Sequence, residues 1–142
     1  MAFNVLVVDD SAVMRTMIIR TLNMTGVEIG EVYQAGNGRE ALDVLEDQWV
    51  DLALVDINMP LMNGEELIEH VRENPLTRDL SIIVVSTESS EARINLIKRQ
   101  GAEFVHKPFT PEALRQTILG VTGVTDEHNA SVAALSGDDL DF

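Results

Sequence analysis

Short apolar runs alternate with longer stretches of helical period along this chain. Four of the runs end directly before a polar group: Val5–Val8 before Asp9, Leu52–Val55 before Asp56, Ile82–Val85 before Ser86, and Phe104–His106 before Lys107. Runs of this length are too short for helices and are typical of strands buried on both faces. The segment 32–35 predicts a further, weaker strand.

Stretches with apolar residues three or four positions apart separate these runs and predict amphipathic helices. The first follows Ser11 and ends before Gly26, and the others cover 38–45, 64–71, 90–99 and 111 to about 119. Ser11 and Thr110 are suitable N-caps, and Pro111 fits the first helical position. Between the third strand and the third helix, residues 58–63 have the Pro and Asn content of a loop.

Strands that alternate five times with helices predict an α/β fold. We expect a doubly wound, five-stranded parallel sheet with right-handed crossovers and helices on both faces. The helical period stops after Gly120. We therefore assign residues 1–120 to one domain and residues 121–142 to an acidic tail that we expect to be mobile.

The composition excludes several classes of function. Ten Lys and Arg against 24 Asp and Glu give a net charge of −14, so we expect no binding to nucleic acid. The absence of cysteine excludes disulfides and thiolate metal sites. No apolar stretch approaches the roughly 18 residues of a membrane span, and no signal peptide is evident at the start. We expect a cytoplasmic protein with no membrane contact.

The polar groups after the strands predict one shared site. Parallel strands bring their carboxyl ends to the same edge of a sheet, where open α/β folds bind ligands. Asp9, Asp10 and Asp56 would repel one another there unless a positive group joins them. Lys107 is one candidate and a bound cation is the other. Oxygen ligands without Cys or clustered His favour Mg²⁺ over zinc.

An acidic Mg²⁺ site with a lysine and a hydroxyl suits a phosphoryl group. In this interpretation Asp56 is the nucleophile that forms an acyl phosphate. Mg²⁺ and Lys107 neutralise the transferring group, and Ser86 donates a hydrogen bond to it. Plainer interpretations stay open. Asp9 and Asp10 could cap the following helix, and Asp56 could be a turn residue. Lys107 could be an ordinary surface lysine, and Ser86 a plain strand-end residue.

Four segments together resemble the response-regulator receiver domains of the CheY type, over roughly residues 4–120. They are 7–11 (VVDDS), 55–64 (VDINMPLMNG), 84–87 (VVST) and 106–109 (HKPF). Each segment alone is moderately specific, whereas all four in this order are highly specific. The resemblance implies a flavodoxin-like (βα)5 fold with strand order 2-1-3-4-5, an order that comes from the family and not from the pattern of residues.

The resemblance also implies a role for each site residue. Asp56 accepts the phosphoryl group from the phosphohistidine of a histidine kinase. Asp10, Asp56 and the Asn58 carbonyl hold Mg²⁺, with Asp9 nearby or acting through water. Lys107 contacts the phosphate and precedes a cis peptide bond to proline.

Two further positions match the switch residues of receivers. Ser86 lies 30 residues after Asp56, as the switch hydroxyl of the family does, and Phe104 falls at the aromatic switch position. Their movement couples phosphorylation to the face formed by the fourth helix, the fifth strand and the fifth helix. We expect a downstream protein to bind this face at Ile94 and Phe104.

We interpret the chain as a single-domain signalling switch, monomeric or weakly dimeric, and not as an enzyme with an external substrate. It could instead serve as a phosphate sink or relay. A Mg²⁺-dependent phosphatase of the haloacid-dehalogenase type would carry Asp-x-Asp after the first strand, and this chain has Asp9-Asp10-Ser11. Asn58 and Glu88 match receivers with a short-lived phosphoryl group.

The tail carries a separate hypothesis. Residues 131–142 resemble the short acidic, amphipathic peptides that bind activated chemotaxis receivers. The tail could therefore compete with partners for the face of the fourth helix, fifth strand and fifth helix. The alternative is a solvated end without a binding role.

Overall fold

The computed structural model describes residues 2–87 and 90–123, in which five strands alternate with five helices. The strands are β1 (Phe3–Val8), β2 (Ile29–Ala35), β3 (Leu52–Val55), β4 (Ser81–Ser86) and β5 (Glu103–His106). The helices are α1 (Ala12–Asn23), α2 (Gly38–Asp47), α3 (Gly64–Glu73), α4 (Glu91–Arg99) and α5 (Pro111–Thr122). None of these helices is long and apolar enough to cross a membrane.

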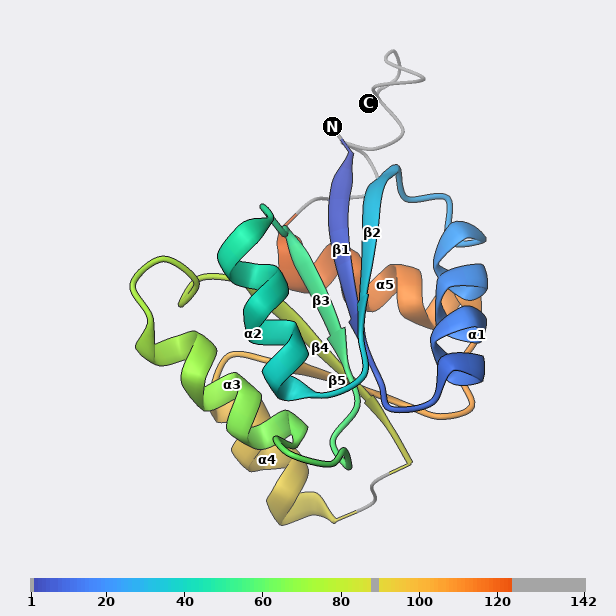
Figure 1. The fold of residues 1–142 in the computed structure, drawn as a ribbon. Helices are drawn as coiled ribbons and strands as arrows, with labels where there is room; N and C mark the ends of the chain where they lie inside the picture. Colours follow the sequence, from blue (N-terminus) through green and yellow to red (C-terminus); the bar gives the residue numbers. More distant parts are fainter. Residues whose placement is uncertain (1, 88–89, 124–142) are drawn as a thin grey trace.

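The strands form one parallel sheet in the order β2-β1-β3-β4-β5. Helices α1 and α5 cover one face, and α2, α3 and α4 cover the other (Figure 1). The predicted fold class and strand order are confirmed. The reversal of strand order beside β1 places the ends of β1 and β3 side by side.

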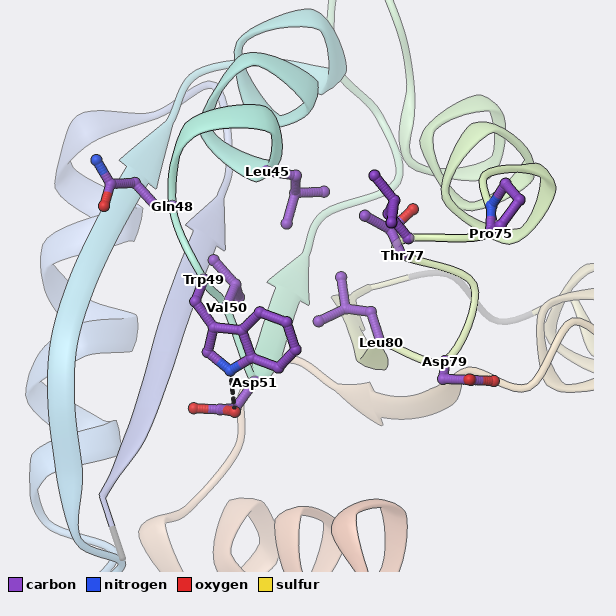
Figure 2. Close-up of a pocket in the computed structure, with 10 residues that line it drawn as sticks. Leu45, Gln48, Trp49, Val50, Asp51, Pro75, Thr77, Asp79 and Leu80 are labelled. Atoms are coloured by element: carbon purple, nitrogen blue, oxygen red, sulfur yellow. Dashed lines mark hydrogen bonds between the residues drawn. The ribbon is translucent and has the colours of Figure 1, made fainter.

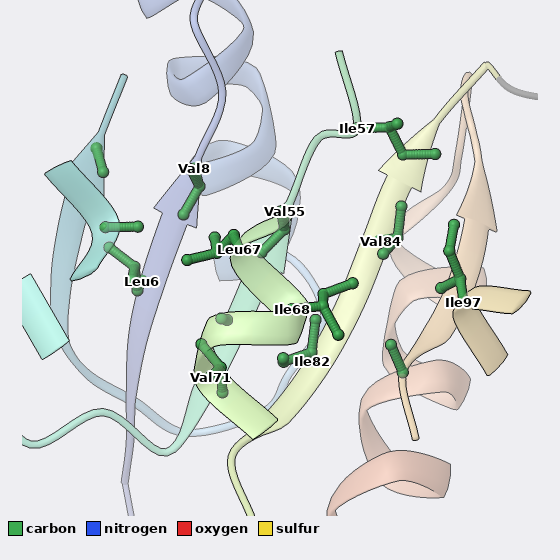
Figure 3. Packing of buried hydrophobic residues seen from close by; sticks show 14 of the residues in the cluster. Leu6, Val8, Val55, Ile57, Leu67, Ile68, Val71, Ile82, Val84 and Ile97 are labelled. Atoms are coloured by element: carbon green, nitrogen blue, oxygen red, sulfur yellow. The ribbon is translucent and has the colours of Figure 1, made fainter. Parts of the chain in front are cut away.

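Successive side chains of a strand point to opposite faces of the sheet, so a continuous apolar run makes both faces apolar. In β1, Leu6 and Val8 belong to the cluster beneath α2, α3 and α4, whereas Val5 and Val7 belong to the cluster beneath α1 and α5. Figure 3 shows the first cluster, in which Leu67 and Ile68 of α3 pack onto the central strands. The two layers of helices hold the sheet, and therefore its polar edge, in place.

The helix starts agree with the predicted caps. The Ser11 side chain accepts a hydrogen bond from the Met14 amide at the start of α1, and Thr110 accepts one from Ala113 at the start of α5. Pro111 occupies the first turn of α5, as predicted. These local signals were readable because capping involves only residues close together in sequence.

Two element ends differ from the prediction by three residues, and the other ends by at most two. Strand β2 begins at Ile29 and not at 32, because Ile29 pairs with Phe3 of β1 although the residues between are polar. Helix α5 continues past Leu119 to Thr122, because Val121 packs against the apolar cluster beneath α1 and α5. Residues 121 and 122 therefore belong to the helix. The rest of the predicted tail, 124–142, lies outside the described residues, so its mobility stays a prediction.

Candidate functional site

Three carboxylates meet at the carboxyl end of the sheet. Asp9, Asp10 and Asp56 each offer one oxygen, and these oxygens lie within 4.8 Å of one another. The Asp9 side chain is 2% exposed and that of Asp56 14%, whereas Asp10 is exposed. The structure thus brings together the acidic cluster that the strand ends predicted, with Asp10 at its mouth.

Main-chain hydrogen bonds hold two of these aspartates. The Asp9 amide donates to the Ala35 carbonyl at 3.1 Å, and the Asp56 amide donates to the Val8 carbonyl at 2.9 Å. Both bonds extend the pairing of the sheet by one residue beyond the strands. The positions of these carboxylates therefore follow from the sheet and not from a flexible loop.

Lys107 reaches into the cluster from the end of β5. Its Nζ lies 3.4 Å from Asp9 Oδ2 and 3.8 Å from Asp56 Oδ1, and its amide donates to the Ser86 carbonyl at 2.8 Å. The following peptide bond to Pro108 is cis, as the resemblance implied. The nearer carboxylate is Asp9, although sequence reasoning paired the lysine mainly with the phosphoryl group on Asp56.

The environment of Asp56 disfavours the charged form of its carboxyl group, mainly because the group is partly buried. The pKa of this carboxyl group is raised. Burial is the largest cause, and the negative charges of Asp9 and Asp10 raise the pKa further. Lys107 and the Ile57 amide lower it, but by less than the other effects raise it. The Ile57 amide donates to Oδ1 at 2.9 Å, the same oxygen that faces Lys107. One lysine therefore does not neutralise three carboxylates, and the site suits a cation as a further partner.

Asp9 has a structural task as well. Its Oδ1 accepts a hydrogen bond from the Ser11 amide at 2.9 Å, so the capping interpretation holds for Asp9 in part. Arg15 of α1 donates to the Asp9 carbonyl at 2.5 Å and to the Gln34 side chain at 2.9 Å. Sequence reasoning missed Arg15, because nothing in the spacing of the chain singles it out from other helical arginines.

The loop after Asp56 passes close beneath the site. The Gly64 amide donates to the Ile57 carbonyl at 2.8 Å. A Cβ at Gly64 would lie 3.0 Å from the Ile57 Cα and still closer to the Asp56 carbonyl oxygen. Asn63 forms a capping box with Glu66 and starts α3 at this glycine. Asn58, a predicted metal ligand, is exposed in the turn that this packing supports.

The two hydroxyls at the end of β4 lie in different surroundings. Ser86 is buried, with 2% of its surface exposed, whereas Thr87 is exposed and lines a shallow apolar hollow with Lys107. Neighbouring side chains of a strand point to opposite faces, and this difference agrees with Ser86, and not Thr87, as the switch hydroxyl. Glu88 lies outside the described residues.

Phe104 lies on the edge strand β5. It is half-buried and packs against the cluster beneath α2, α3 and α4. Its ring meets that of His106 edge-on, with 4.7 Å between centroids. The structure places Phe104 in the region expected of an aromatic switch, and its movement stays a prediction.

Helix α4 exposes a different residue from the one proposed for the partner surface. Ile97 is buried and Ile94 is half-buried, whereas Leu96 is 48% exposed. Leu96 faces a groove between α3 and α4 together with Glu65 and Glu69. On a helix of nine residues the packing angle against the sheet decides which apolar side chain stays outside, and the periodicity alone did not resolve it.

Comparison with known proteins agrees with this geometry. A family model, the response regulator receiver domain, matches residues 5–119. The chain belongs to this family. As a receiver domain it is a component of two-component signalling, and receivers generally bind Mg²⁺ at an acidic pocket of the kind formed by Asp9, Asp10 and Asp56.

Several chemotaxis proteins are similar to this receiver domain over nearly their whole length. A chemotaxis protein CheY homolog of Campylobacter jejuni is 38% identical over 128 residues, which cover 89% of this chain and 97% of that protein. Chemotaxis protein CheY1 of Helicobacter pylori is 36% identical and covers 85% of this chain and 98% of its own. The structure of CheY4 of Vibrio cholerae superposes with a TM-score of 0.74 at 36% identity, over 85% of this chain and 99% of that one.

Proposed function

We propose that this receiver accepts a phosphoryl group on Asp56 from the phosphohistidine of a histidine kinase, and then signals by binding another protein. The observation that carries the proposal is the meeting of three carboxylates with Lys107 at the end of the sheet. The similarity to chemotaxis proteins supports a chemotaxis-type pathway. The receiver turns over no external substrate in this proposal.

The donor set fits Mg²⁺. Asp10, Asp56 and the Asn58 carbonyl would hold the ion, with Asp9 beside it or acting through water. All of these are oxygen ligands, and the raised pKa of Asp56 reflects burial together with the neighbouring negative charge of Asp9 and Asp10. When bound, Mg²⁺ supplies positive charge against the oxygens of the transferring phosphoryl group.

The residues of this chain have distinct tasks in the transfer. A carboxylate oxygen of Asp56 attacks phosphorus and forms the O–P bond of an acyl phosphate. The N–P bond of the donor breaks, and its electron pair leaves with the imidazole, which takes a proton from solvent. Lys107 donates to the phosphoryl oxygens, and Ser86 donates a hydrogen bond to the phosphorylated state. The Ile57 amide keeps the Asp56 carboxylate oriented.

The test is phosphorylation by a small donor. Incubation with acetyl phosphate and Mg²⁺ should add about 80 Da to the intact protein, the mass of one phosphoryl group, and peptide mapping should place it on Asp56. Asp56→Asn should carry no adduct. Asp43→Asn, at an exposed position of α2, is the matched control and should be labelled like the wild type. An adduct that persists in Asp56→Asn would contradict the proposal, and hydrolysis of many phosphate monoesters would favour the phosphatase alternative.

The output is a protein partner on the face of α4, β5 and α5. Phe104 and Ile94 are half-buried there, and Leu96 adds exposed apolar surface. A phosphate sink or relay would need no such partner, so affinity for a candidate target is measured with and without the phosphoryl group. We expect that group to be short-lived in Mg²⁺, because Asn58 and Glu88 match fast-cycling receivers.

The oligomeric state and compartment are part of the same proposal. We expect a cytoplasmic protein. We also expect a monomer or weak dimer, because a net charge of −14 opposes close self-association. Sedimentation before and after phosphorylation measures the state directly.

A further inference from the structure

A hollow lined by both apolar and polar side chains lies at the pole of the molecule opposite the carboxylates. It measures about 310 Å³ and lies between the segment after α2 and the segment after α3 (Figure 2). Leu45, Trp49, Pro75, Leu76 and Leu80 supply its apolar surface. Trp49 is 74% exposed and Leu76 88%. Large apolar side chains gathered at one place on a surface are typical of a contact site.

Trp49 is exposed but held in one orientation. Its indole N–H donates to Asp51 Oδ1 at 2.9 Å, and Asp51 Oδ2 accepts from the Asn4 amide at 2.9 Å. The Trp49 carbonyl also accepts from the Asn4 side chain at 3.3 Å. An aromatic ring fixed in this way loses little conformational entropy when another group packs on it. The hollow is therefore ready to receive apolar side chains.

The chain leaves α5 next to this hollow. Ser81, directly after Leu80, donates from its hydroxyl to the Val121 carbonyl at 3.4 Å. A smaller hollow is lined by Val121, Arg78, Asp79 and Leu80. Asp79 and Leu80 also line the hollow at Trp49, so the two hollows are neighbours. Helix α5 ends at Thr122, and the residues that follow it start beside the smaller hollow.

The charged residues around the two hollows limit which of the residues after α5 can bind there. Asp51 and Asp79 line the hollow at Trp49 and disfavour acidic residues there. Arg78 is exposed and forms no ion pair with any residue in 2–87 or 90–123, whereas Arg72 beside it donates to four carbonyl oxygens. Arg78 lines the smaller hollow and is thus the cation there that an acidic pair after α5 can bind.

The sequence after α5 has an acidic pair first and an uncharged stretch with apolar residues after it, the order in which Arg78 and the hollow at Trp49 follow the end of α5. Asp126-Glu127 comes first, then 128–137 without Asp, Glu, Lys or Arg but with Val132 and Leu135, and only then Asp138, Asp139 and Asp141. Val132 comes nine positions after Gly123, and an extended chain of that length spans about 30 Å.

We propose that residues 126–135 fold back on their own domain at this pole. Asp126 and Glu127 pair with Arg78, and Val132 and Leu135 enter the hollow against Trp49. The segment then covers the apolar surface away from the α4, β5 and α5 face, where the sequence alone suggested that it could dock. The proposal does not depend on phosphorylation of Asp56.

Trp49 is the single tryptophan of the chain and reports on the hollow directly. In the full chain, the double variant Val132→Asp, Leu135→Asp should shift Trp49 emission to the red and raise the acrylamide quenching constant about twofold, because apolar contact is lost. Leu140→Asp, the same change beyond the neutral stretch, is the matched control and should leave both unchanged. All three substitutions lie outside 2–123, so circular dichroism should show an intact fold.

Charge reversal tests the other half of the contact. Arg78→Glu should raise quenching, and adding Asp126→Lys, Glu127→Lys to it should restore the wild-type value. Quenching that is the same in the wild type and the double apolar variant would overturn the proposal. Quenching that falls as protein concentration rises would show that a second copy covers Trp49, and would overturn it as well.

Discussion

At the residue scale, the site is defined by unequal charge. Three carboxylates face one lysine, and the most protected pair, Asp9 and Asp56, lies on either side of it. Asp9 directs one oxygen to the Ser11 amide, so its charge is partly satisfied inside the protein. Asp56 is left with a raised pKa, because burial and the charges of Asp9 and Asp10 outweigh Lys107 and the Ile57 amide.

The raised pKa of Asp56, caused by burial first and by Asp9 and Asp10 after it, predicts a pH-dependent effect of Asp56→Asn in metal-free protein. The folded pKa of Asp56 lies above 3.8, so between these two values the native state binds more protons than the unfolded state. The free energy of unfolding therefore falls as pH rises through the folded pKa. Above it, wild type bears a cost that the Asn variant lacks. The variant should melt at a higher temperature near neutral pH, and its advantage should shrink on acidification.

Thermal melts in EDTA from neutral pH down to about 4 measure this difference. Asp43→Asn serves as the control, because Asp43 is exposed on α2 and should show no such pH-dependent gain. An advantage of Asp56→Asn that stays constant across the pH range would contradict the charge argument.

At the scale of the elements, close backbone approaches decide where the site residues lie. Helix α3 begins against the end of β3, with the Gly64 amide bonded to the Ile57 carbonyl. Helix α2 begins against the same loop, where the Gly38 amide donates to the Met62 carbonyl at 3.0 Å. The turn that carries Asp56 and Asn58 is thus clamped between two helix starts.

Gly64→Ala should therefore destabilise the domain. The new Cβ would press on the Asp56 carbonyl and the Ile57 Cα, and the backbone would have to move. We expect a loss of about 2 kcal/mol or more, measured by urea denaturation, with slower phosphorylation because Asp56 shifts. Gly120→Ala in α5 is the matched control: nothing lies within 4 Å of its added Cβ, and alanine should stabilise the helix by about 0.5–1 kcal/mol. A Gly64→Ala protein as stable as wild type would show that the clamp is loose.

At the scale of the whole molecule, the two ends of the sheet carry different sites. The carboxyl end gathers the three carboxylates, and the other end carries the hollow beside Trp49. Two buried apolar clusters, one on each face of the sheet, fill the space between the sheet and its helices.

Mg²⁺ should stabilise the whole domain, since it binds the folded arrangement of carboxylates and not the unfolded chain. At 100 times its dissociation constant a ligand adds about 2.7 kcal/mol to the free energy of unfolding. We expect a higher melting temperature in MgCl2 than in NaCl of equal ionic strength, which controls for screening of the net charge of −14. Asp10→Asn should lose most of the gain. Equal melting temperatures in the two salts would argue against a specific cation site.

Much of this organisation could be predicted from the sequence, because it rests on local patterns. Apolar runs placed Asp9, Asp56 and Lys107 at strand ends, and caps such as Ser11 marked helix starts. Other features depended on contacts between distant segments. The nearness of Lys107 to Asp9, and the exposure of Leu96 in place of Ile94, follow from how elements pack.

The sequence by itself determined the alternation of strands and helices and the residue types at the polar edge, since period and capping act over a few neighbouring residues. The tertiary structure decided the rest. It set the distances from Lys107 to the carboxylates of Asp9 and Asp56, and the close approach that requires a glycine at position 64. It also set the hydrogen bond by which Asp51 holds Trp49 in place. Such facts depend on distances between segments far apart in sequence, and only packing fixes those distances.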